Sequence, residues 1–163
     1  MDKNLVIIGR AARKEIMNFA RRHPNIGNPV DLTCFCAIAS YFFKLVAEPF
    51  GYDLTLVEGI AFDSSYKGKP IQRRDINHCW TEYDGMVYDL TATQFKSGNA
   101  VHVVKNTNKN YISVNPGIKT DDRNLSESFP DWIDEQTPIM FKRELKRRAE
   151  NVVYNLQVSR AIA

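Results

Sequence analysis

Two hydrophobic periodicities alternate along the chain and predict its elements. Apolar residues recur every three or four positions over residues 10–22, 33–47 and about 138–160, which predicts helices with one buried face. The order predicts an α+β fold in which N-terminal helices pack on an antiparallel meander and an amphipathic helix follows at the C-terminus. The expected strands are rich in β-branched and aromatic residues and span residues 54–62, 77–83, 86–91, 101–105 and 111–114.

Residues with strong local preferences mark the ends of these elements. Asp31 and Thr33 are both suitable N-caps for the second helix, and Gly51 ends the segment that follows it. A polar loop, residues 63–76, connects the first two strands. An Asn- and Lys-rich turn at residues 105–110 is expected to join the last two strands as a solvated hairpin tip.

The dipeptide Asp84-Gly85 predicts the register of the hairpin formed by the second and third strands. Asp-Gly is favoured in two-residue type I′ turns, so Tyr83 should face Met86. Continued outward, this register places His78 and Asp89 diagonally on one sheet face, because side chains alternate between faces. Diagonal neighbours lie about 7–8 Å apart at Cα, within reach of an imidazole–carboxylate hydrogen bond.

Length and composition are those of an ordinary globular chain. A total of 163 residues suits a single domain, and 44% hydrophobic with 25% charged residues can bury a core. No apolar run approaches the ~20 residues that a membrane span needs. The apolar run near the N-terminus stops after four residues, which is too short for the core of a secretory signal. We therefore expect a cytoplasmic protein.

The net charge of +3 does not require a nucleic-acid partner, and we expect none. The charge is unevenly distributed, however. Residues 1–23 and 138–163 each carry six Lys or Arg and two acidic residues, a net charge of +4 at each end. A charged helix face is usually just solvated. The alternative is an acidic partner that docks on these basic terminal helices.

Three cysteines are too few, and odd in number, for a disulfide framework, which leaves catalysis or metal binding. Cys34 and Cys36 lie in the first turn of the expected second helix, where the helix dipole and backbone N–H groups favour thiolate. A protonated His78 would lower the thiol pKa further, and Asp89 would orient its imidazole.

This order of residues resembles the transglutaminase-like branch of the papain-like cysteine enzymes. The segment from His78 to Gly85 is similar to the His-x-Trp-x-Glu-x strand of that family, and Tyr88-Asp89-Leu90-Thr91 is similar to its Asp strand. Residues 45–51 resemble the end of its Cys helix. The resemblance covers roughly residues 30–95 and implies a papain-like, transglutaminase-like core over about residues 30–115.

The family pattern favours Cys36 over Cys34 as the nucleophile. In the family the cysteine stands about fifteen residues before the glycine that follows its helix, which is the separation between Cys36 and Gly51. Ser40 matches the small residue expected four positions after the cysteine. Cys34 remains the alternative because Phe35 mimics the aromatic residue that often follows the nucleophile. The chain departs from the pattern two residues before Cys36, where glycine is common.

The resemblance implies a cysteine-dependent amide hydrolase, such as a peptidase, isopeptidase or amidase, acting on a protein or peptide through a thioester acyl-enzyme. Cys36 would be the nucleophile, His78 the general base and acid, and Asp89 the residue that orients it. Acyl transfer, as in a transglutaminase or glutamine deamidase, is one alternative, and a catalytically inactive binding protein of the same fold is another. No cofactor or metal is implied. The backbone N–H of the nucleophile would be one oxyanion donor, and the candidates for the second are Asn28, Gln72, Asn77 and Gln94.

A zinc module is a different class of function that the cysteines permit. Cys34, Cys36, His78 and Cys79 offer four possible ligands. Cys-x-Cys is a less usual chelate spacing than Cys-x-x-Cys, and strand alternation puts His78 and Cys79 on opposite faces. Cys79 is therefore expected to pack away from the catalytic site. A pure binding protein that uses only its basic terminal helices is the third class.

Overall fold

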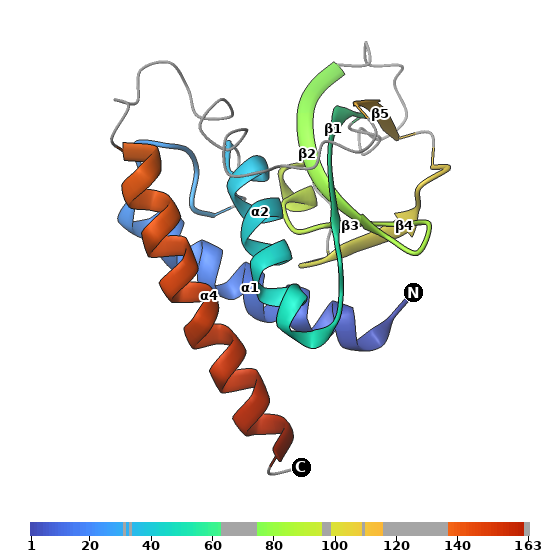
Figure 1. Cartoon of the computed structure of the whole chain (residues 1–163). Coiled ribbons are helices and arrows are strands. Elements are labelled where there is room, and N and C mark those ends of the chain that lie inside the picture. Colours follow the sequence, from blue (N-terminus) through green and yellow to red (C-terminus); the bar gives the residue numbers. More distant parts are fainter. Residues whose placement is uncertain are drawn as a thin grey trace.

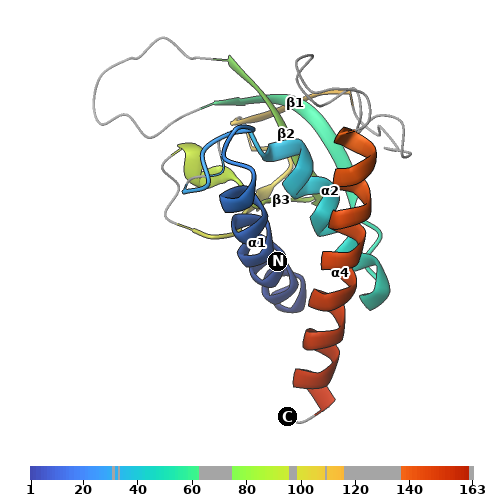
Figure 2. The same cartoon turned by 90° about the vertical axis from the view of Figure 1, so that its left-hand side faces the viewer.

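A computed structural model describes residues 1–30, 32, 34–62, 75–95, 99–108, 110–115 and 137–161. In this part of the chain, α-helices pack together beside a curled five-stranded antiparallel sheet (Figures 1 and 2). The expected α+β class is confirmed. The helices are α1 (Lys3–Arg22), α2 (Cys36–Ala47) and α4 (Thr137–Ala161), and the strands are β1 (Thr55–Phe62), β2 (Asp75–Tyr83), β3 (Met86–Asp89), β4 (His102–Lys105) and β5 (Tyr111–Asn115).

Helix α1 begins seven residues earlier than the expected start at residue 10. The carboxylate of Asp2 caps it by accepting hydrogen bonds from the backbone N–H groups of Asn4, at 2.8 Å, and Leu5, at 3.1 Å. Its apolar stripe begins at Leu5 and continues along the whole helix, so tertiary packing as well as the cap stabilises the first turns.

Helix α2 begins at Cys36 rather than near residue 33. Leu32 and Cys34 have φ angles of 64° and 68°, in the left-handed region that a right-handed helix excludes. The helix can therefore start only after Cys34, with Phe35 as the N-cap residue. The two N-caps expected from the sequence, Asp31 and Thr33, lie outside the described residues.

Helix α2 lies at the centre of the helical layer. It contacts α1, α4, β1 and β2, and eight of its twelve residues are buried. The apolar stripe expected on α4 packs against the same core, with Phe141, Leu145 and Ala149 buried and its last turns only partly covered. This packing holds the N-terminal end of α2 in a defined position against the sheet.

The sheet has the strand order β4-β3-β2-β1-β5. The predicted hairpin register is confirmed, because Tyr83 faces Met86 and Thr81 faces Tyr88. Asp84 and Gly85 have φ angles of 49° and 68°, as a type I′ turn requires at both central positions.

The expected hairpin between β4 and β5 is wrong. Strand β4 pairs with β3, whereas β5 pairs with β1 at the opposite edge of the sheet. The sheet curls so strongly that these edges approach each other (Figure 1). The ring of Tyr111 on β5 stacks on that of His102 on β4, with 6.1 Å between centroids. A short connection therefore crosses between two edges instead of forming a hairpin turn.

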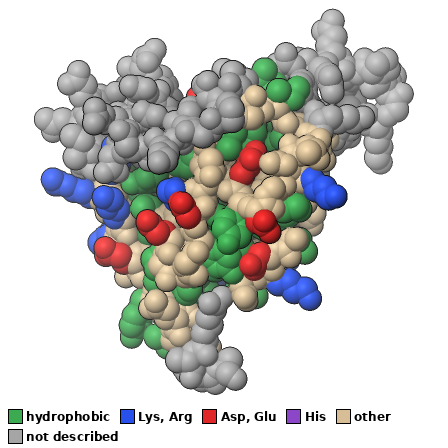
Figure 3. All heavy atoms as spheres, turned by 45° about the vertical axis from the view of Figure 1, so that its right-hand side comes forward, with side chains coloured by type: hydrophobic (Ala, Val, Ile, Leu, Met, Phe, Trp, Pro, Cys, Tyr) green, Lys and Arg blue, Asp and Glu red, His purple; other side chains and the backbone are tan. Residues whose placement is uncertain are grey.

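The surface carries both signs of charge. On the face drawn in Figure 3, acidic side chains lie across the middle and Lys and Arg lie nearer the edges. This face therefore has no large field of one sign. Among the described residues, no helix has the length and apolar character needed to cross a membrane.

Candidate active site

The three residues expected to carry chemistry come from three elements that meet beside α2. Cys36 is the first residue of α2, His78 lies in β2, and Asp89 is the last residue of β3. His78 and Asp89 are each 1% exposed, and Cys36 is half-buried. The structure thus brings together all three.

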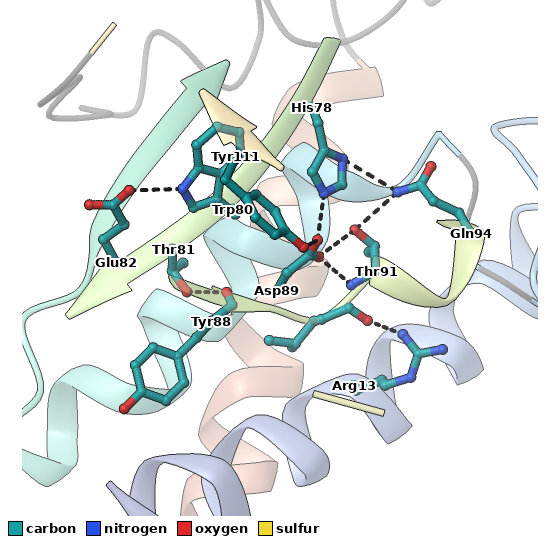
Figure 4. A network of polar contacts seen from close by, with 11 residues as sticks. Arg13, His78, Trp80, Thr81, Glu82, Tyr88, Asp89, Thr91, Gln94 and Tyr111 are labelled. Atoms are coloured by element: carbon teal, nitrogen blue, oxygen red, sulfur yellow. Dashed lines mark hydrogen bonds and ion pairs between the residues drawn. The ribbon is translucent and has the colours of Figure 1, made fainter. Parts of the chain in front are cut away.

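His78 and Asp89 form the contact that the hairpin register predicts (Figure 4). Nε2 of His78 lies 2.7 Å from Oδ2 of Asp89. Burial by itself would lower the pKa of His78, but attraction and hydrogen bonding to Asp89, and then to Cys36, raise it to about 10. The imidazole is therefore a cation at neutral pH. Because Nε2 is used by Asp89, Nδ1 is the ring nitrogen that remains for Cys36.

Neutral donors hold the carboxylate of Asp89 in place. Oδ1 accepts hydrogen bonds from the backbone N–H of Thr91, at 2.7 Å, and from its hydroxyl, at 3.0 Å. Oδ2 accepts a hydrogen bond from the hydroxyl of Tyr111, at 2.9 Å. Although burial opposes ionisation, attraction to His78 and these bonds keep the pKa of Asp89 below its usual value. The Asp89 carboxylate therefore stays ionised, and its negative charge lies next to His78.

Aromatic rings line the sheet face around His78. Trp80 stacks at 6.1 Å between ring centroids, and Tyr111 lies at 6.5 Å. Gly59, which faces His78 across β1 and β2, is needed for this packing. A Cβ atom on Gly59 would lie 2.2 Å from the carbonyl oxygen of Ile112 and 2.5 Å from the Trp80 ring. The rings remove water from around the imidazole and restrict its orientation.

The pKa of the Cys36 thiol depends on two residues of β2. Hydrogen bonds from the Cys79 thiol and then from His78, together with attraction to the imidazolium, hold the pKa of Cys36 well below its usual value despite burial. The backbone N–H of Cys79 adds a further hydrogen bond. The Cys36 thiol is therefore more readily ionised beside His78 than a free thiol.

The expectation that Cys79 packs away from the site is wrong. Alternation along β2 does put Cys79 on the face opposite His78, because adjacent side chains of a strand point to opposite faces. The N-terminus of α2, however, lies against the strand so that the thiol of Cys36 reaches both neighbours. Cys79 directly follows His78 in the sequence, and this adjacency could have indicated that both lie near the site. Strand alternation alone predicted instead that Cys79 points away from it.

Cys34 occupies a different environment from Cys36. It is exposed, precedes α2 and has the left-handed φ angle that stops the helix from including it. The hydrogen bonds from β2 reach Cys36, so the geometry favours Cys36 as the nucleophile.

Of the four candidates for a second oxyanion donor, Gln94 lies at the site. Its Nε2 is 3.4 Å from Nδ1 of His78 and 3.3 Å from the hydroxyl oxygen of Thr91. Asn28 instead accepts a hydrogen bond from the backbone N–H of Val30, in a local turn. Gln72 and the side chain of Asn77 lie outside the described residues.

Arg13 of α1 supports the site and was not singled out from the sequence. It is 6% exposed, and its guanidinium donates to the carbonyl oxygen of Leu90 (Figure 4). It also donates to the hydroxyl of Thr93, at 2.8 Å. These bonds tie the segment that follows Asp89 to α1 and so position Gln94. Its spacing from Gly9 and Ile16 puts Arg13 on the buried face of the helix, which is the signal that could have found it.

Comparisons with protein-family models, with curated proteins and with solved structures found no match to this chain. Within the described ranges, no group of three or more His, Cys, Asp or Glu side chains is arranged to hold a metal ion. The case for a function therefore rests on the geometry around Cys36.

Proposed function

We propose that this protein is a cysteine-dependent amide hydrolase with a papain-like, transglutaminase-like core, acting on a protein or peptide substrate. The observation that carries the proposal is the buried hydrogen bond between His78 and Asp89 beside Cys36 at the start of α2, whose pKa His78 lowers. A nucleophile at the start of a buried helix, with a base and its orienting acid on two adjacent antiparallel strands, matches the resemblance found in the sequence.

The reaction divides an amide hydrolysis into two easier steps. The Cys36 thiolate attacks the carbonyl carbon, and its electron pair forms the C–S bond while the carbonyl oxygen becomes an oxyanion. His78 donates the proton from Nδ1 to the leaving amine, the C–N bond breaks, and a thioester remains on Cys36. Neutral His78 then takes a proton from water, whose oxygen attacks the thioester and releases the acid and the thiolate.

Two donors suit the oxyanion. The backbone N–H of Cys36 lies at the N-terminus of α2, where helix N–H groups lack intrahelical partners and the dipole is positive. Gln94 supplies the second in our proposal, because its amide lies on the Nδ1 side of His78. Because Nδ1 of the imidazolium is itself a donor and cannot accept from this amide, the amide N–H is free to bind the substrate oxygen.

Acyl transfer to an amine shares the first of these steps, because only the molecule that resolves the thioester differs. A free thiol nucleophile suits a reducing compartment, which supports the expectation of a cytoplasmic protein. The basic terminal helices remain a possible docking site for an acidic partner.

The first test is alkylation of the native protein by iodoacetamide from pH 5 to 9, with the labelled cysteine mapped by mass spectrometry. A thiolate–imidazolium pair predicts fast labelling of Cys36 below pH 7, because the thiol is already ionised there. His78→Ala should slow labelling at pH 6 by at least about tenfold, since a loss of ~1.4 kcal/mol in thiolate stabilisation gives that factor.

Cys34→Ser is the matched control and should leave the labelling rate of Cys36 unchanged. Labelling of Cys34 in place of Cys36, or a Cys36 rate that rises only near the ordinary thiol pKa of ~8.5, contradicts the proposed nucleophile. Peptide thioesters or activated amides then test acylation. Water release gives a hydrolase, whereas capture by an added primary amine gives a transferase.

A further inference from the structure

A short segment after β3 carries two parts of the proposed site. Gln94 lies in the 3₁₀ helix η2 (Ala92–Phe95), and its backbone N–H donates to the carbonyl oxygen of Thr91, at 3.0 Å. Its side-chain amide lies 3.3 Å from the Thr91 hydroxyl (Figure 4). Thr91 in turn donates its N–H and its hydroxyl to Asp89. The position of this segment therefore decides where both the orienting carboxylate and the proposed second oxyanion donor lie.

Arg13 holds the segment at two points. One guanidinium nitrogen donates to the carbonyl oxygen of Leu90, and the other donates to the hydroxyl of Thr93, at 2.8 Å. The pairing of β3 with β4 ends at Asp89, so Leu90 lies just beyond the paired part of these strands. Because a guanidinium is a rigid planar fork, two bonds from one group fix the segment more precisely than a single donor would. The next residue after Thr93 is Gln94.

The two proposed oxyanion donors come from different layers of the fold. The backbone N–H of Cys36 belongs to α2, whereas Gln94 follows a strand of the sheet. Helix α1, which carries Arg13, packs on α2. Arg13 therefore links the segment of Gln94 to the helical layer that holds Cys36. This link matters because an oxyanion donor acts fully only at about 2.7–3.1 Å from the oxygen.

We propose that Arg13 is a positioning residue for acylation of Cys36, which it promotes by holding the amide of Gln94 in place beside the backbone N–H of Cys36. This inference rests on the proposed function, because it requires a carbonyl substrate at Cys36. It concerns stabilisation of the oxyanion and not ionisation of the thiol. A reaction of Cys36 that forms no oxyanion should therefore proceed without help from Arg13.

Two reagents separate these effects at the same sulfur. With iodoacetamide, the thiolate attacks a saturated carbon, the C–S bond forms, and iodide leaves with the electron pair of the C–I bond. With p-nitrophenyl acetate, the thiolate attacks the carbonyl carbon and the π electron pair moves to the oxygen. When that pair returns, p-nitrophenolate leaves and an acetyl thioester remains on Cys36. The ratio of acetylation to alkylation therefore measures stabilisation of the oxyanion apart from reactivity of the thiol.

The test compares this ratio among variants of the full chain at pH 7. Cys34→Ser is the parent chain, because it removes the exposed thiol, and mass spectrometry maps the modified cysteine. Gln94→Ala should lower the ratio about a hundredfold, as for loss of one oxyanion donor. Arg13→Met should lower it at least about tenfold, because the amide is present but displaced. The variant with both changes should match Gln94→Ala, because the arginine acts through that amide.

Two further variants separate positioning from a general loss of structure. Arg148→Met removes an arginine that is also 6% exposed, from the contact between α1 and α4, and should leave the ratio unchanged. Thr93→Val removes one of the two acceptors of Arg13 from a half-buried position. It should lower the ratio roughly threefold or more, because one holding bond remains. Thr93→Val thus keeps the inference testable if Arg13→Met does not fold.

An unchanged ratio in Arg13→Met and Thr93→Val overturns the inference, and so does an equal fall in Arg148→Met. Additive losses in the double variant overturn it too, because Arg13 would then act by a route other than Gln94. If the parent chain is alkylated and acetylated fast at Cys36 but neither rate depends on Arg13, the proposed function stands and only this inference fails. Slow alkylation of Cys36 in the parent chain removes the nucleophile on which both depend.

Discussion

Two histidine–carboxylate pairs lie in the described part of the chain, and they differ in burial and in what else holds the carboxylate. His78 and Asp89 are 2.7 Å apart, with side chains 0% and 1% exposed. His23, which caps the C-terminus of α1, lies 3.3 Å from Glu144 of α4, and both side chains are 23% exposed. An imidazole thus lies beside a carboxylate both inside the sheet, where the partner is Asp89, and at a helix–helix contact, where it is Glu144.

The second carboxylate is shared with an arginine. Oε1 of Glu144 accepts hydrogen bonds from Nε of Arg148, at 2.8 Å, and from Nη2, at 2.6 Å. Arg148 also pairs with Glu15 of α1 and lies over the Phe19 ring. Although burial opposes it, Arg148 and then His23 hold the pKa of Glu144 below its usual value. This pair stabilises the packing of α1 against α4.

The difference shows that the surroundings of a histidine–carboxylate pair decide its role. One pair stabilises the packing of two helices, and the other raises the pKa of a buried imidazole. A carboxylate already paired with a guanidinium has little unbalanced charge left for a histidine. Asp89 is hydrogen-bonded by the neutral groups of Thr91 and Tyr111, so its charge acts on His78 and through it on Cys36. The experiments below compare the two pairs directly.

The largest effect is expected from Asp89→Asn. Loss of the charge removes the carboxylate that contributes most to the raised pKa of the buried His78, which should lower the free energy of unfolding by about 3–5 kcal/mol. The labelling rate of Cys36 at pH 6 should also fall, because a less basic His78 no longer stabilises the thiolate. Urea unfolding at pH 7 and iodoacetamide labelling measure the two effects. The matched variant Glu144→Gln should leave the labelling rate unchanged, and equal loss in both variants would refute the distinction.

A smaller effect on stability, without an effect on reactivity, is expected from Arg148→Met. This change removes the ion pairs with Glu15 and Glu144 but keeps an apolar side chain against Phe19. We expect a loss of about 2 kcal/mol, the order of a hydrogen-bonded charge. Urea unfolding gives the loss, and an altered labelling rate of Cys36 would show that the two regions are coupled.

The pH dependence of stability should distinguish the site from the helix contact. The contribution of His78, whose pKa is raised, is complete below its ordinary value of 6.5 and is lost as pH rises through about 10. That of Cys36, whose pKa is lowered, is complete above 9.0 and is lost as pH falls through its folded pKa.

Between pH 6.5 and 9.0 the two groups act in opposite directions, because the folded chain favours a proton on His78 and the unfolded chain favours a proton on Cys36, so stability should change less than His78 alone would make it. From pH 9 to 10 the unfolded chain loses its proton while His78 in the folded chain keeps one, so the free energy of unfolding should fall by about 1.4 kcal/mol or more. Cys79, whose pKa is raised, adds to this fall. In Cys36→Ser the decline should begin near pH 6.5, whereas Glu144→Gln should keep the native profile above that pH in urea titrations at each pH, because the pKa of Glu144 lies below its usual value.

The smallest effect is expected from Tyr111→Phe. It removes one of the hydrogen bonds to Oδ2 of Asp89 while the ring beside Trp80 and His78 remains. We expect a loss of about 1 kcal/mol in stability, as for one buried hydrogen bond. Labelling of Cys36 should remain fast at pH 6. A rate as low as that of Asp89→Asn would mean that the tyrosine hydroxyl, and not the carboxylate alone, maintains the imidazolium.

Rules for turns and periodicity predicted the structure correctly where the residues in contact belong to one helix or one hairpin. The Asp84-Gly85 turn set a register over eleven positions, and alternation from that turn placed His78 beside Asp89. Helical periodicity likewise identified the buried stripe of α4. In both cases the backbone geometry of one element or one hairpin relates the residues, so no knowledge of the remaining chain is required.

Only the tertiary structure decided the contacts that depend on how layers pack. Strand β5 pairs with β1 at the edge of the sheet. In the curled sheet, Tyr111 on this strand reaches Asp89 and donates a hydrogen bond to it, which no local sequence pattern specifies. The docking of α2 on β2 chose Cys36 for the contact with His78 and placed Cys79 against it. By itself, the sequence determined which residue types stand at a helix start and on two paired strands. The distances between side chains on different elements depend on how residues far apart in the chain pack together. Rules for turns and periodicity describe only neighbouring residues, so they do not predict these distances.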